Sequence, residues 1–115
     1  MRIVPDAELS ARQKAQLEPV RAQLTGKMIS FWEDEEAEQV VCVGDQIHTD
    51  MSNGYQGAFI SPGKWVLVCD VRLAVSVIGD PGATGFLFAD ILVGEEKKIV
   101  ILPTEYTVLD SNEAI

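Results

Sequence analysis

The sequence predicts an α+β fold that is mainly β, namely a small antiparallel barrel or rolled sheet of five to six strands with one N-terminal helix. Residues 65–77 alternate apolar and mixed positions without an internal Gly or Pro, as a long strand does. Short segments rich in Gly, Pro and Asp separate the apolar runs, which is typical of antiparallel strands joined by tight turns. No regular alternation of strand and helix signals occurs, and this disfavours a parallel sheet.

The long strand has one uniformly apolar set of positions. These are the odd positions Trp65, Leu67, Cys69, Val71, Leu73, Val75 and Val77. Asp70 and Arg72 fall on the even positions, so we expect one dry face and one half-wet face. We expect almost complete burial of Leu67, Val71, Leu73 and Val75. Because globular strands usually have about five or six residues, we also expect this one to bend and to serve two regions of the sheet.

The N-terminal segment predicts a helix over residues 7–17, with Asp6 as its cap. Pro19 should end this helix, since a proline inside a helix costs about 3 kcal/mol. Residues 20–24 fit either a helix or a strand, and a strand is expected over 25–32.

The rest of the chain predicts further strands joined by polar connections. Residues 33–38 are a charged connection, and residues 44–57 are irregular. Residues 79–85 predict a hairpin turn, because they lack the Gly-Lys-Ser/Thr ending of a phosphate loop. The expected strands are 39–43, which should pair back onto 28–32, then 55–60, 84–93, 99–102 and 104–109.

Length and composition fit a single globular domain over residues 1–115. With 47% hydrophobic residues the chain can build a core without metal or disulfide staples, so no cofactor is required for folding.

Cys42 and Cys69 each lie in an apolar run, and we expect buried free thiols. The N-terminus has no signal-peptide pattern and no apolar run approaches about 20 residues, so the expected location is the cytoplasm, without membrane insertion.

One cluster of side chains has the chemistry of a divalent-metal site. It comprises Asp45, His48 and Asp50, and His48 is the single histidine of the chain. An imidazole with two carboxylates can hold a divalent metal, but Asp-rich loops also form ordinary solvated turns. Both interpretations of this loop stay open.

The aromatic residues suggest two further sites. Tyr55, Trp65, Phe86 and Phe88 could line a small-molecule pocket in a barrel, or could simply fill the core. Met28, Phe31 and Trp32 crowd into one predicted strand, and the adjacent Phe31 and Trp32 should point to opposite faces. One of the two aromatics is therefore a candidate anchor for a protein interface.

Two functions follow as hypotheses. The first is a non-enzymatic acidic module that binds a protein partner or itself, with a homodimer expected through residues 25–32. The second is a small-ligand or divalent-metal site, which could be an enzyme, at residues 44–57 and the mouth of the barrel. A single histidine and the lack of a Gly-x-Ser-x-Gly motif weigh against catalysis.

The charge distribution predicts that the protein does not bind nucleic acid. The net charge is −9; residues 1–30 carry +2 and residues 31–115 carry −11. Because a phosphate backbone attracts Lys and Arg and repels carboxylates, we expect no gel shift with duplex or single-stranded DNA or RNA at physiological salt. A salt-dependent shift at micromolar protein would contradict this expectation.

Overall fold

The computed structural model describes residues 1–32, 37–49, 59–60, 63–103 and 105–109, and the statements below concern these residues. A 3-10 helix spans Asp6–Glu8, and the α-helix α1 spans Ala11–Leu24. The strands are β1 Arg2–Ile3, β2 Met28–Phe31, β3 Ala37–Val43, β4 Gln46–Thr49, β5 Phe59–Ile60, β6 Trp65–Val75, β7 Phe86–Val93, β8 Glu96–Ile101 and β9 Tyr106–Leu109.

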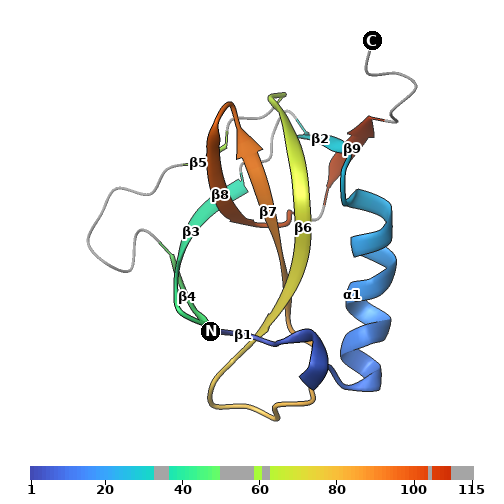
Figure 1. Ribbon diagram of the computed structural model, residues 1–115, viewed down its shortest axis with the longest axis vertical. Helices are drawn as coiled ribbons and strands as arrows, with labels where there is room; N and C mark the ends of the chain where they lie inside the picture. The colour runs from blue at the N-terminus through green and yellow to red at the C-terminus, as the bar shows by residue number, and fades with distance from the viewer. Residues whose placement is uncertain (33–36, 50–58, 61–62, 104, 110–115) are drawn as a thin grey trace.

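Six strands form a closed antiparallel barrel. Their order is β1-β4-β3-β8-β7-β6, and the ring closes where β1 pairs with the end of β6. Strand β2 pairs with the beginning of β6, β9 pairs with β2, and β5 adds to β3. Figure 1 shows the ring, with α1 beside β6 on its outer side. The predicted fold class, a mainly β barrel with one N-terminal helix, is confirmed.

Two hydrophobic clusters stabilise this arrangement. The barrel core receives a side chain from every strand of the ring and therefore lies inside it: Ile3, Val40, Ile47, Ala74 and Phe88, with Ile99 and Ile101 packed against them. The outer core lies between the barrel wall, α1 and β2, and includes Leu17, Leu24, Ile29, Phe31, Val66, Val68, Val71 and Leu73. Two layers of apolar side chains thus cover the two faces of β6.

Strand β6 bends and serves two sheet regions, as predicted, but the predicted face is buried only in the second half of the strand. The pairing with β7 shifts register between Val68 and Asp70, which marks a β-bulge at Cys69. Before the bulge the even positions Val66 and Val68 are buried; after it the odd positions Val71, Leu73 and Val75 are buried. One extra residue reverses the alternation.

The bulge therefore corrects the prediction of a single dry face. Trp65 and Cys69 are exposed, and Leu67 is only partly buried. Val77 lies beyond the end of β6 and is exposed. The predicted burial is confirmed for Val71, Leu73 and Val75 and is wrong for Leu67.

The helix begins and ends later than predicted. Ser10, not Asp6, is its N-cap: the Ser10 hydroxyl accepts a hydrogen bond from the backbone N–H of Gln13, and the Gln13 side chain accepts one from the backbone N–H of Ser10. Pro19 lies inside α1 on its exposed side. Leu17 and Leu24 lie on either side of Pro19 and are buried. The burial of each leucine stabilises the fold by about 1.5–3 kcal/mol, which offsets the cost of the proline.

Residues 20–24, which fitted either a helix or a strand in the sequence, are helical. The helical conformation places Leu24 in the outer core, and burial of this side chain stabilises it. The following strand is correspondingly shorter than predicted and comprises Met28–Phe31 only. No helix in the described part of the chain is both long and apolar enough to cross a membrane.

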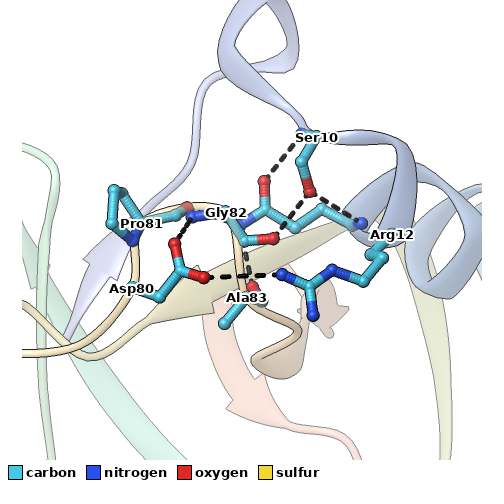
Figure 2. Close-up of polar contacts among 7 residues, drawn as sticks. Ser10, Arg12, Asp80, Pro81, Gly82 and Ala83 are labelled. Atoms are coloured by element: carbon cyan, nitrogen blue, oxygen red, sulfur yellow. Dashed lines mark hydrogen bonds and ion pairs between the residues drawn. The ribbon is translucent and has the colours of Figure 1, made fainter.

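A buried glutamine attaches the connection between β6 and β7 to the start of α1. Gln13 is fully buried, and its amide nitrogen donates hydrogen bonds to the carbonyls of Pro81, at 2.7 Å, and Ala83, at 2.8 Å. The Ser10 hydroxyl donates to the carbonyl of Gly82 at 2.7 Å (Figure 2). The sequence predicted a turn here, and the structure shows that this turn is held by side chains distant in the sequence.

The end of the same connection makes a second attachment. Gln16 accepts a hydrogen bond from the N–H of Gly85 at 3.0 Å and donates one to its carbonyl at 2.6 Å. A Cβ atom at Gly85 would overlap the carbonyl oxygen of Ala74, so this position admits only glycine without a shift of the backbone.

We expect Leu73→Ala to lower the free energy of unfolding by about 2–5 kcal/mol, because it leaves a cavity in the outer core. Ile78→Ala is the control, since Ile78 is 92% exposed. Urea unfolding followed by circular dichroism measures both variants. Equal midpoints for the two would show that β6 is not central to the core.

We expect Gln13→Ala to cost about 1–3 kcal/mol, because the carbonyls of Pro81 and Ala83 lose their donor. Gln23→Ala on the same helix removes an exposed glutamine and is the matched control. Thermal unfolding of the two variants tests the prediction, which a shared melting temperature would contradict.

Candidate functional site

The adjacent aromatics of β2 separate onto two faces, as the sequence predicted. Phe31 is 2% exposed and belongs to the outer core, whereas Trp32, the next residue, is 50% exposed. Successive side chains of an extended chain point to opposite sides. Only Trp32 of this pair is available for an interface.

Several apolar side chains lie on the face of β6, β2 and β9 opposite the outer core, and Trp32, the residue after β2, alternates with Phe31 onto the side of Met28 and Ser30. Ser30 pairs with Trp65 on one side and with Thr107 on the other. Met28 pairs with Leu67 and with Leu109. We call this set the tryptophan face, and it consists of Met28, Ser30, Trp32, Trp65, Leu67, Thr107 and Leu109.

Both tryptophans of the chain lie on the tryptophan face. Trp65 is 42% exposed, which is unusual for so large an apolar side chain. Ser30, which pairs with Trp65 and with Thr107, is buried. None of the seven residues is charged, although the protein carries a net charge of −9. Glu105, the residue before β9, is exposed, and it adjoins the Phe31–Tyr106 pair on the side of Trp32, so one carboxylate borders the face there.

The aromatic residues predicted to line one ligand pocket are dispersed. Phe88 is buried in the barrel core. Phe86 is exposed and pairs with Ala74 near the end of β6, whereas Trp65 begins that strand. Tyr55 lies outside the described residues. The described members of this group therefore do not surround a common cavity.

The predicted metal-ligating residues lie around the turn between β3 and β4. Asp45 is exposed in the turn, and its carboxylate is 3.3 Å from the Nε of Arg2. His48 is exposed on β4 opposite Val41. Asp50 lies outside the described residues, and among the described ones no group of three potential ligands is gathered. The metal site stays a prediction.

A pocket of about 370 Å³ lies against β6, β7 and β8, close to the bulge. It is lined by Cys69, Arg72, Asp90, Ile91, Lys97, Lys98 and Ile99. Arg72 and Asp90 form an ion pair at 2.7 Å, with about a quarter to a third of each side chain exposed. The sequence did not reveal this pocket, because the two lysines fall between the expected strands 84–93 and 99–102 and instead belong to β8.

The cysteines also differ from the prediction. Both are free thiols, as expected, but Cys69 is exposed and Cys42 only partly buried. Cys69 is the residue at the bulge, where the normal alternation of buried and exposed positions is interrupted. The residues before Cys69 form an apolar run without interruption, and such a run does not indicate a bulge. The sequence therefore did not indicate that Cys69 is exposed.

Comparison with protein-family models, with curated proteins and with solved structures finds no match for this chain, so the candidate sites rest on their geometry.

Proposed function

We propose that this protein is a non-enzymatic interaction module that associates with a second copy of itself through the tryptophan face. The observation that carries the proposal is an exposed, uncharged sheet face that holds both tryptophans of an acidic chain. Tryptophan is the residue most enriched at the energetic centres of protein interfaces.

The choice of a second copy follows from charge. Two molecules of net charge −9 repel each other over most of their surfaces. The tryptophan face carries no charge of its own, so two copies can approach there with the least repulsion. A charged partner, in contrast, would find no complementary group on this face. Twofold dimers are also the commonest symmetric assemblies, and they bring the same patch of each subunit together.

The expected interface packs two sheets face to face. Sheets that pack in this way interleave the side chains of their facing surfaces. Trp32 and Trp65 would then lie at the centre, with Met28 and Leu109 beside them and Glu105 at the polar rim. A stable interface of this kind buries about 1,600 Å² in total.

We expect light scattering across a concentration series to show a dimer at tens of micromolar. Intrinsic fluorescence adds a direct readout, because both tryptophans lie on the proposed interface. As the concentration rises, the emission should shift to the blue, and quenching by acrylamide should weaken.

Trp32→Ser should raise the dissociation constant of the dimer at least about tenfold, which corresponds to about 1.4 kcal/mol. Phe86→Ser is the matched control, because Phe86 is 59% exposed but lies near the other end of β6. A monomer at all concentrations, or equal weakening by the two variants, would overturn the proposal.

A further inference from the structure

We propose that the pocket on β6, β7 and β8 binds a small organic anion, with an oxyanion head and a short apolar body. This site is separate from the tryptophan face and does not depend on self-association. We define the anion pocket by the residues that carry the argument: Arg72 on β6, Asp90 on β7, and Lys97, Lys98 and Ile99 on β8.

The strand register explains why these groups converge. Asp90 pairs with Ile99 across β7 and β8, and Arg72 reaches diagonally from β6 to the Asp90 carboxylate at 2.7 Å. The ion pair therefore spans two strands of the barrel wall. The Nε of Arg72 is buried and has no hydrogen-bond partner among the described residues. The guanidinium thus has donor capacity that Asp90 alone does not satisfy.

The charge balance of the pocket is opposite to that of the protein. Its lining includes three cations and one carboxylate, whereas the whole chain has twice as many acids as bases. Lys98 is engaged, with its Nζ 3.1 Å from the amide oxygen of Gln39 and 3.4 Å from Glu96. Lys97 is exposed and has no ion-pair partner in the described part of the chain.

Lys97 is therefore the cation most available to a ligand. Lys97 lines the same pocket as the partly buried guanidinium of Arg72, and cations gathered in one pocket can receive an oxyanion, because charge-assisted hydrogen bonds are stronger than neutral ones. The nearby acids are already engaged: Asp90 with Arg72, Glu96 with Lys98, and Asp70 with Arg21 at 3.2 Å.

Size and lining indicate the rest of the ligand. A volume of about 370 Å³ is at the lower end of the range for small-molecule sites, roughly 300–1,000 Å³. Ile99 and the exposed Cys69 contribute apolar surface beside the charged groups. Such a pocket favours an anion that carries a short hydrocarbon over a bare inorganic anion.

The experiment titrates the full chain with hexanoate, hexyl phosphate, inorganic phosphate and hexylamine, and follows binding by calorimetry. We expect saturable binding of hexanoate or hexyl phosphate, weaker binding of inorganic phosphate, and none of hexylamine. The tighter of the two organic anions identifies the head group. The Trp32→Ser variant should bind the same ligands equally well, which separates this site from the dimer interface.

Lys97→Gln should weaken the binding of the organic anion about tenfold, because it removes the available cation. Lys14→Gln is the matched control, since it makes the same charge change at an exposed position of α1. Cys69 supplies a second readout: a bound ligand should slow its alkylation by N-ethylmaleimide, followed by mass spectrometry of the peptide that contains it.

Three results would overturn the proposal. The first is that neither organic anion saturates the protein at concentrations up to about 10 mM, because this concentration is above a dissociation constant in the millimolar range. The second is equal weakening by Lys97→Gln and Lys14→Gln. The third is binding of hexylamine as tight as that of hexanoate, which would show that the charge of the pocket does not select the ligand.

Discussion

The bulge at Cys69 is the constraint on which the rest of the structure depends. Strand β6 is shared by the closed barrel and by the smaller sheet with β2 and β9, and it covers the outer core along its whole length. A regular strand that twists between two sheets would turn its apolar side away from one of them. One additional residue restores the buried face, since Val66 and Val68 precede it and Val71 and Leu73 follow it.

Both candidate sites follow from this single reversal. Because the even positions are buried before the bulge, Trp65 and Leu67 are directed to the outside and become part of the tryptophan face. Because the odd positions are buried in the outer core after it, Arg72 lies on the barrel side of β6, as Ala74 does, and reaches Asp90. The bulge residue itself is exposed between the two sites, at the edge of the pocket.

Charge and polar contacts complete the arrangement in different ways. The net charge of −9 favours solubility, whereas the seven residues of the tryptophan face carry no charge. Inside the fold, polar groups act as attachments: Gln13 and Gln16 hold the connection between β6 and β7 through backbone carbonyls and an N–H that would otherwise be unpaired.

The sequence by itself determined the fold class, the long strand and the separation of Phe31 from Trp32, because these depend on local alternation and on turn residues. Only the tertiary structure decided the helix boundaries, where burial of Leu24 outweighed Pro19, and the exposure of Cys69 and Leu67, where the pairing with β7 introduced a bulge. The tryptophan face and the anion pocket combine strands distant along the chain. The alternation pattern and the turns constrain register within a hairpin, but the neighbours of non-consecutive strands, such as β6 beside β2, are decided only by the packing of the whole barrel.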